Sequence, residues 1–158
     1  MTSRKVYYGY ETFLADTKQL TQKIEWEFDA IIAIARGGLS LAQLLGEYYD
    51  IRAVYGINTI GYDDTQKLDS VKVFNIPQLQ DARSVLIVDD IVDSGDTLIE
   101  VLKVLAEAYP HITFKTASLF YKKSAKIAPN WYVKESTEWI DFYWTVDMQK
   151  NDNTTGIN

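Results

Sequence analysis

Val85-Leu86-Ile87-Val88-Asp89-Asp90-Ile91-Val92-Asp93-Ser94-Gly95-Asp96-Thr97 is the stretch that decides the fold, because it joins an apolar run, two acids and a hydroxyl-rich loop. Residues 85–88 are apolar, mostly β-branched and without polar alternation, which is typical of a strand covered on both faces of a parallel sheet. From Thr97 onward apolar residues recur at helical spacing. The stretch therefore predicts a buried strand that ends in acids, a tight turn over residues 93–97, and a helix.

The turn between this strand and helix has the properties of a phosphate site. The first N–H groups of a helix are unpaired, the helix dipole favours an anion there, and Gly95 lets the backbone come close. Ser94 and Thr97 add hydroxyl donors. Asp89 and Asp90 would repel a phosphate, so we expect them to face sugar hydroxyls, a cation, or both. The order of parts predicts a site for a phosphorylated sugar.

Each of these residues also has a simpler explanation when it is taken alone. An Asp at the end of a parallel strand is common in α/β proteins, and a Ser/Thr/Asp cluster before a helix often serves only as an N-cap. The unbroken order of the parts is what favours a functional site. Asp96 adds a negative side chain beside the phosphate loop, so we expect it to point into solvent.

A second strand-loop-helix unit lies nearer the N-terminus. Residues 30–35 form another uniformly apolar run, Arg36-Gly37-Gly38 follows at once, and helical spacing resumes at Leu41. If the two strands are parallel, both loops lie at the sheet edge where open α/β sheets bind ligands. The Arg36 guanidinium and the N–H groups of the glycines suit a second anion. The alternative is a tight turn with an exposed arginine.

Composition places the chain among ordinary globular domains. It has 158 residues, of which 47% are hydrophobic and 24% are charged, so we expect one domain over residues 1–150 and a polar tail over residues 151–158. No apolar stretch reaches the roughly 18 to 20 residues that cross a bilayer. The lack of cysteine and of a signal-like N-terminus favours the cytoplasm. A net charge of −6 argues against nucleic acid as a partner.

Residues 85–97 resemble the phosphoribosyl-pyrophosphate signature of type I phosphoribosyltransferases: four apolar residues, two acids, two apolar residues, then Asp-Ser/Thr-Gly-X-Thr. With Arg36-Gly37-Gly38, Lys122 and Trp139-Ile140, the resemblance runs along nearly the whole chain to the bacterial xanthine-guanine members. It implies an α/β fold with a central, mostly parallel twisted sheet, flanking helices and a small hood. It also implies purine salvage, in which the 5-phosphoribosyl group of phosphoribosyl pyrophosphate passes to a 6-oxopurine and pyrophosphate leaves.

The resemblance assigns roles to the loops. It implies that phosphoribosyl pyrophosphate is bound by Arg36, Gly37, Gly38, Asp89, Asp90, Asp93, Ser94, Gly95, Asp96 and Thr97. Mg²⁺ is the implied cofactor, held by Asp89 directly or through water. Asp93 is the implied catalytic residue, placed to exchange a proton with N7 of the purine. Family members often have a cis peptide before the first loop, so we expect one between Ala35 and Arg36.

The base site is implied at the C-terminal end of the chain. Lys122 resembles the lysine that donates to the 6-oxo group, while Trp139 and Ile140 would supply a stacking ring and backbone contacts. Tyr62 and Lys67 fall in a polar stretch where relatives have a flexible loop, and either could reach the pyrophosphate. The alternatives are solvated lysines, a tryptophan in the core or an oligomer contact, and a solvated hairpin tip.

The sequence leaves part of the function open. Guanine and xanthine are the implied bases, with hypoxanthine a further option, but the family's Trp-Asp pair reads Trp144-Thr145 here. Another phosphoribosyltransferase with a different base is one alternative. A nucleotide-sensing regulator that has lost catalysis is the other. The resemblance implies a homodimer or homotetramer, without membrane or nucleic-acid partners.

Overall fold

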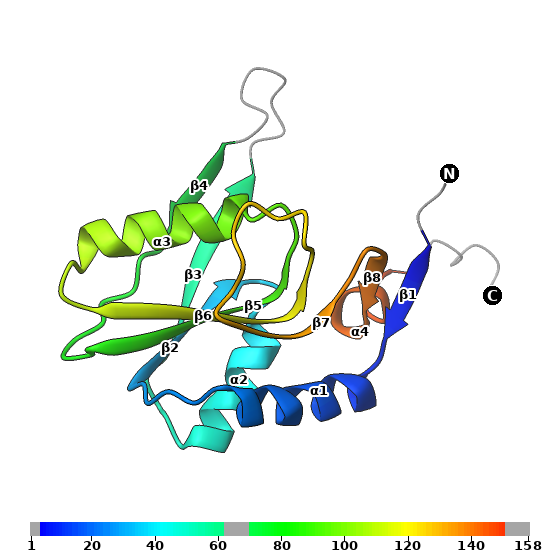
Figure 1. The fold of residues 1–158 in the computed structure, drawn as a ribbon, viewed down its shortest axis with the longest axis horizontal. Helices are drawn as coiled ribbons and strands as arrows, with labels where there is room; N and C mark the ends of the chain where they lie inside the picture. The colour runs from blue at the N-terminus through cyan, green and yellow to red at the C-terminus, as the bar shows by residue number, and fades with distance from the viewer. Residues whose placement is uncertain (1–3, 62–69, 151–158) are drawn as a thin grey trace, which may run out of the picture.

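A six-stranded sheet forms the centre of the protein in a computed structural model that describes residues 4–61 and 70–150 (Figure 1). Four neighbouring pairs of strands are parallel, and only β3 and β4 are antiparallel. The mostly parallel α/β sheet predicted from the sequence is therefore confirmed. The strand order across the sheet is β4 (Val71–Phe74), β3 (Val54–Gly61), β2 (Ala30–Ala35), β5 (Ser84–Val92), β6 (Thr113–Tyr121) and β7 (Trp131–Glu135).

Helices cover both faces of this sheet, which explains the uninterrupted apolar runs of β2 and β5. Ile31 and Leu86 belong to the core cluster on the side of α1 and α2, whereas Ile32 and Ile87 belong to the cluster on the side of α3. All four side chains are fully buried. Within residues 4–61 and 70–150 no helix is both long and apolar enough to span a membrane. The helices that cover the central sheet are α1 (Tyr10–Lys23), α2 (Leu39–Tyr49) and α3 (Asp96–Ala108).

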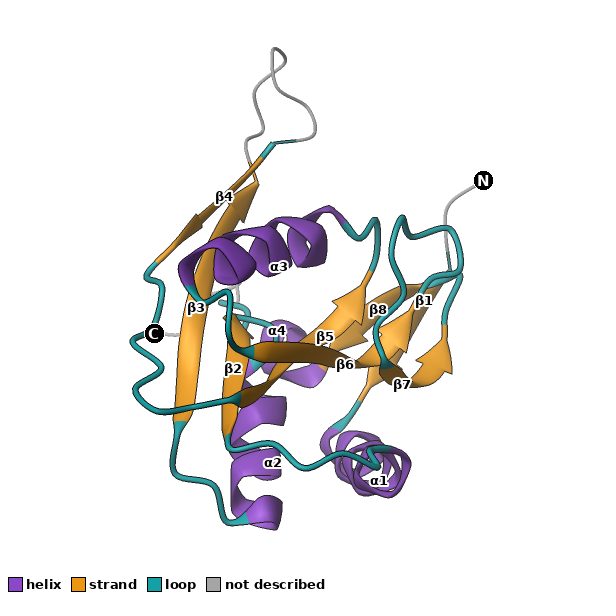
Figure 2. Ribbon diagram, turned by 60° about the vertical axis from the view of Figure 1, so that its left-hand side comes forward, coloured by secondary structure: helices purple, strands orange, loops and turns teal. Residues whose placement is uncertain are grey.

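A small second sheet joins the two ends of the described chain. The strands β1 (Lys5–Tyr8) and β8 (Trp139–Phe142) pair in parallel, with Lys5 opposite Trp139, and α4 (Tyr143–Val146) follows. Figures 1 and 2 show β1 and β8 side by side, next to the β7 edge of the central sheet. We call β1, β8 and α4 the hood.

A buried polar contact fastens the hood to the central sheet. The Tyr8 hydroxyl donates a hydrogen bond to Asp16 Oδ2 at 2.6 Å, and Lys134 Nζ lies 3.1 Å from the same oxygen. Burial, together with the Asp16 carboxylate, raises the pKa of Tyr8, so the hydroxyl keeps its proton. The Tyr8 ring also packs edge-on against Phe120 and Phe142. Strand β1 is thus joined to α1 and β7.

The local predictions from the sequence agree with the structure except around the predicted turn 93–97, where β5 ends later than expected and α3 already begins at Asp96. The apolar run 30–35 is β2, and residues 96–108 form the predicted helix α3. Strand β5, however, continues to Val92, so Asp89 and Asp90 lie within the strand and not after it. The cause is pairing with β6, which continues as far as Val92 opposite Tyr121. The connecting loop is therefore limited to residues 93–95.

Gly38 rests directly on β5. A Cβ atom at this position would collide with the carbonyl oxygen of Val88 and would lie 3.1 Å from the Cα of Asp89. Both neighbours are backbone of a central strand, so neither can move aside without disturbing the sheet. The loop between β2 and α2 can approach the end of β5 only because residue 38 lacks a side chain.

We expect Gly38→Ala to lower the free energy of unfolding by about 1–3 kcal/mol, the usual cost of overpacking. Chemical denaturation monitored by circular dichroism measures this change. Gly56→Ala is the matched control, because a Cβ there would meet only the Leu39 side chain at an ordinary 3.8 Å. Equal stability of the two variants would contradict the tight packing of Gly38.

Candidate active site

Two loops meet at the carboxyl edge of the central sheet, one after β2 and one after β5. The strands pair in parallel with Ala33 opposite Val88, which brings both strand ends to the same edge. The peptide bond between Ala35 and Arg36 is cis, as the sequence predicted. A Cβ on Gly37 would lie 2.5 Å from a carboxylate oxygen of Asp90, so this glycine also permits a close approach. The loop 36–38 and the acids of β5 therefore share one site.

Asp89 and Asp90 form an enclosed pair of acids. The Asp90 N–H donates to Asp89 Oδ1 at 2.8 Å, and the Ile91 N–H donates to Asp90 Oδ1 at 2.7 Å. Burial, and then the charge of Asp90, raise the pKa of Asp89 well above the usual range, and burial raises the pKa of Asp90. No lysine or arginine of the described ranges forms an ion pair with either acid. The pair thus favours binding of a cation or of hydroxyl donors.

The acids alone do not make a complete metal cage. No group of three or more His, Cys, Asp or Glu side chains in residues 4–61 and 70–150 is placed to hold a metal ion. Two neighbouring carboxylates still fit a hard divalent cation such as Mg²⁺, which commonly takes one or two carboxylates and completes its shell with water and substrate phosphate. A cation here would need further ligands from its substrate.

A small cavity of about 80 Å³ lies over the loop between β5 and α3. Gly95 has a φ of 89°, a left-handed conformation that favours glycine, and the Asp96 N–H donates to Ser94 Oγ at 3.2 Å. The cavity opens at the N-terminus of α3, where helix N–H groups and dipole attract an anion. It is lined by Asp89, Ile91, Val92, Asp93, Ser94, Gly95, Thr97 and Leu98.

Asp96 does not point freely into solvent, so that prediction was wrong. Its side chain is only 25% exposed, and its Oδ1 lies 2.7 Å from Lys126 Nζ. The hydrogen bond from Lys126 lowers the pKa of Asp96 and keeps it ionised. The sequence could not indicate this partner, because Lys126 reaches α3 from the loop after β6.

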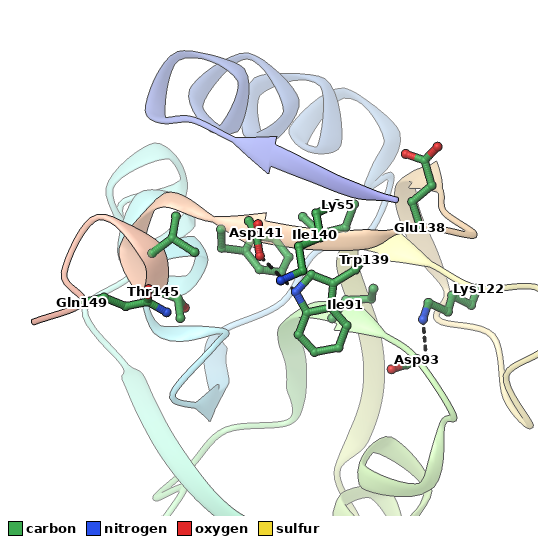
Figure 3. Close-up of a pocket in the computed structure, with 12 residues that line it drawn as sticks. Lys5, Ile91, Asp93, Lys122, Glu138, Trp139, Ile140, Asp141, Thr145 and Gln149 are labelled. Carbon is green, nitrogen blue, oxygen red and sulfur yellow. Dashed lines mark hydrogen bonds and ion pairs between the residues drawn. The ribbon is translucent and has the colours of Figure 1, made fainter. Parts of the chain in front are cut away.

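A larger cavity of about 390 Å³ lies between the hood and the ends of β5 and β6 (Figure 3). Trp139 is 56% exposed, and its indole N–H donates to Asp141 Oδ1 at 3.0 Å, which sets the orientation of the ring. Lys122 Nζ pairs with Asp93 Oδ1 at 2.9 Å. The lining residues are Lys5, Ile91, Asp93, Lys122, Glu138, Trp139, Ile140, Asp141, Phe142, Thr145, Val146 and Gln149.

The two cavities adjoin, because Ile91 and Asp93 line both of them. Their shapes differ: the larger cavity offers an exposed aromatic ring, whereas the smaller one offers helix N–H groups and hydroxyls. A ligand with a flat ring at one end and a phosphate at the other would fill both.

The structure brings together most of the site residues that the sequence indicated. It adds Lys5, Asp141 and Thr145 to the larger cavity. Asp141 carried a local signal, since it lies two residues after Trp139 in an extended segment and so shares its face. Lys5 carried none, because only the pairing of β1 with β8 brings it there. Tyr62 and Lys67 lie outside the described residues.

The sheet and its paired cavities define an α/β protein whose carboxyl edge has the shape and chemistry for a phosphorylated, ring-bearing ligand. The phosphoribosyl transferase domain family matches residues 13–151 of the sequence. The chain therefore belongs to the phosphoribosyltransferase family.

Individual relatives agree with this assignment. The solved xanthine-guanine-hypoxanthine phosphoribosyltransferase of Helicobacter pylori is 43% identical with a TM-score of 0.85, over 91% of this chain and 96% of that one. The xanthine-guanine phosphoribosyltransferase of Cereibacter sphaeroides is 35% identical over 76% of this chain and 71% of its own. A Neisseria gonorrhoeae protein solved with bound ppGpp is 27% identical with a TM-score of 0.74, over 92% and 91% of the chains.

We expect Asp89→Asn to raise the free energy of unfolding at neutral pH, because burial and the charge of Asp90 raise the pKa of Asp89 well above its usual range. A raised pKa means that the folded state holds the proton more tightly, so this group favours folding at low pH. That contribution is lost as pH rises through the raised pKa. The gain in the variant should shrink as pH falls towards the ordinary carboxyl pKa of about 4.

Urea unfolding at several pH values, without divalent cations, measures this difference. Asp81→Asn removes an exposed acid and serves as the control. If Asp89→Asn were no more stable than the wild type at neutral pH, the acid pair would not be destabilising.

Proposed function

We propose that this phosphoribosyltransferase acts in purine salvage, moving the 5-phosphoribosyl group of phosphoribosyl pyrophosphate onto a 6-oxopurine and releasing pyrophosphate. Guanine and xanthine are the proposed bases, with hypoxanthine a further option. The observation that carries the proposal is the shared wall of the two cavities, Ile91 and Asp93, which lets one nucleotide occupy both. The names of the H. pylori and C. sphaeroides relatives support the choice of bases.

The loop 93–97 would hold the 5′-phosphate and so anchor the sugar. Its donors are the N–H groups at the start of α3 and the hydroxyls of Ser94 and Thr97. Asp89 and Asp90 would face the ribose hydroxyls, where their negative charge stabilises the positive charge that develops on the sugar as pyrophosphate leaves. Their raised pKa values reflect a site built for that missing positive charge.

The loop 36–38 would bind the leaving pyrophosphate through Arg36 and the N–H groups of the two glycines. Mg²⁺, held by Asp89 directly or through water, would neutralise the pyrophosphate charge. Gly37 lies close to Asp90, so the loop 36–38 and the acids would both border the sugar whose bond to pyrophosphate breaks. Contacts on both the sugar and the pyrophosphate would orient that bond.

The larger cavity would hold the base. Trp139 would stack on the purine, with Asp141 fixing its ring, and Lys122 would donate to the 6-oxo group. Asp93 would then exchange a proton with N7 as the bond to N9 forms. Thr145, which replaces the Asp usual in the family, both donates and accepts, so it suits the 2-amino group of guanine and the 2-oxo group of xanthine.

Incubation of the protein with Mg²⁺, phosphoribosyl pyrophosphate and one base at a time tests the proposal. We expect nucleotide product with guanine, xanthine or hypoxanthine, and none with adenine, orotate or uracil. A chelator should abolish the product and added Mg²⁺ should restore it. Product only with another base would replace the proposed substrate.

A nucleotide sensor is the second candidate function, favoured by the bound ppGpp of the N. gonorrhoeae protein. A guanine nucleotide of this kind would place its ring in the larger cavity and a phosphate in the smaller one. Binding of guanine nucleotides without turnover of any base would favour this function.

The proposal also covers the assembly and location of the protein. Residues 1–150 would form one domain followed by a polar tail over residues 151–158, acting in the cytoplasm as a homodimer or homotetramer without nucleic-acid or membrane partners. Light scattering after size-exclusion chromatography gives the number of subunits.

We expect Asp93→Asn to lower kcat by about 100-fold or more, the usual scale for a general acid–base group. Steady-state kinetics with the preferred base measure the change. Glu135→Gln is the matched control, because Glu135 is also an exposed acid paired with a lysine, Lys123, but does not line either cavity. Near-normal turnover of Asp93→Asn would remove Asp93 from catalysis.

A further inference from the structure

The segment 122–127, after β6, forms a second wall of the phosphate loop. The Lys122 N–H donates to the carbonyl of Val92 at 3.0 Å, and the Lys126 N–H donates to the carbonyl of Ser94 at 2.8 Å. A Cβ on Gly95 would lie 3.1 Å from the backbone nitrogen of Lys126, so the two segments are in close contact. This wall therefore holds the backbone at both ends of Asp93, through the carbonyls of Val92 and Ser94.

Two charged pairs cross between the wall and the loop: Lys122 with Asp93, which lines the larger cavity, and Lys126 with Asp96. Lys126 Nζ lies 2.7 Å from Asp96 Oδ1, with the two side chains 57% and 25% exposed. Asp96 is the first residue of α3 and directly follows Gly95, the N-cap of that helix. Its carboxylate therefore lies at the N-terminal end of α3, next to the cavity for the proposed phosphate but outside the lining of that cavity, so the two negative charges would repel each other across a short distance.

We propose that Lys126 is a positioning residue that neutralises Asp96, so that the loop 93–97 can bind a sugar 5′-phosphate despite its extra acid. This inference rests on the proposed function for the anion that it invokes. Asp96 directly follows the loop residue Gly95, so its charge acts on an anion in the loop at short range. The hydrogen bond from Lys126 lowers the pKa of Asp96, so Asp96 stays negatively charged. A positive charge beside Asp96 is therefore needed to offset its repulsion of the phosphate.

An experiment can distinguish neutralisation of Asp96 by Lys126 from a purely mechanical role of the Lys126 side chain. The backbone hydrogen bond from Lys126 to Ser94 does not involve the side chain, so a Lys126 variant keeps this tie between the two segments. If the Lys126 side chain served only to hold the two segments together, removing either Lys126 or Asp96 would weaken phosphate binding equally. If it acts through charge, removing Lys126 weakens phosphate binding, and removing Asp96 as well restores it.

The experiment compares Lys126→Met, Asp96→Asn and the double variant with the wild type. Binding of ribose 5-phosphate by calorimetry reports on the phosphate site without any need for turnover, and kinetics then give KM for phosphoribosyl pyrophosphate and kcat. Lys123→Met is the matched control, since it removes a neighbouring charge that pairs with Glu135 at 3.6 Å, away from the loop.

We expect Lys126→Met to weaken ribose 5-phosphate binding and raise KM by about fivefold to tenfold, the effect of one partly screened charge, with kcat changed less than twofold. Asp96→Asn should bind the phosphate more tightly than the wild type. The double variant should return to within about threefold of the wild type, and Lys123→Met should match the wild type.

Two results would overturn the inference. One is a double variant that binds ribose 5-phosphate as weakly as Lys126→Met does, which would mean that the pair only holds the two segments together. The other is equal binding by Lys126→Met and Lys123→Met. If the wild type itself bound no ribose 5-phosphate, the proposed function would fail instead, so the two failures are distinguishable.

Discussion

The site depends on a contact that only glycine allows, where the loop after β2 rests on the end of β5. Gly38 lies against the backbone of Val88, and Gly37 lies against the carboxylate of Asp90. Parallel pairing of β2 with β5 brings the two strand ends together, and the missing side chains close the remaining gap. Without this contact the loop 36–38 could not approach the acids of β5, and the two loops proposed to bind anions would belong to separate sites.

Stability and function oppose each other at the acids of β5. Enclosing Asp89 beside Asp90 costs free energy, because burial and like charge both raise its pKa. The two apolar clusters of the sheet compensate, since β2 and β5 are buried on both faces. A preorganised negative site is what a reaction that develops positive charge on a sugar requires. The proposed chemistry therefore explains why the protein tolerates the free-energy cost of placing Asp89 beside Asp90.

The sequence predicted those features whose causes are local. Uniform apolar runs located β2 and the first half of β5, and the order of acids, hydroxyls and glycine located the loop between β5 and α3. Features that depend on distant segments were missed. Asp96 looked like a solvated acid because Lys126 lies 30 positions away, and Lys5 reaches the larger cavity only through the pairing of β1 with β8. The second half of β5 likewise depends on β6.

Asp93 and Lys122 link the two cavities, and this link has a consequence for the order of events in the proposed reaction. The two side chains pair at 2.9 Å, while Asp93 also lines the smaller cavity. The Lys122 N–H is also hydrogen-bonded to the carbonyl of Val92, the last residue of β5, directly before this loop. A phosphate that orders the loop 93–97 would therefore also order Lys122. Binding of the sugar phosphate first would prepare the base cavity, because the base then meets a lysine and a carboxylate that are already in position.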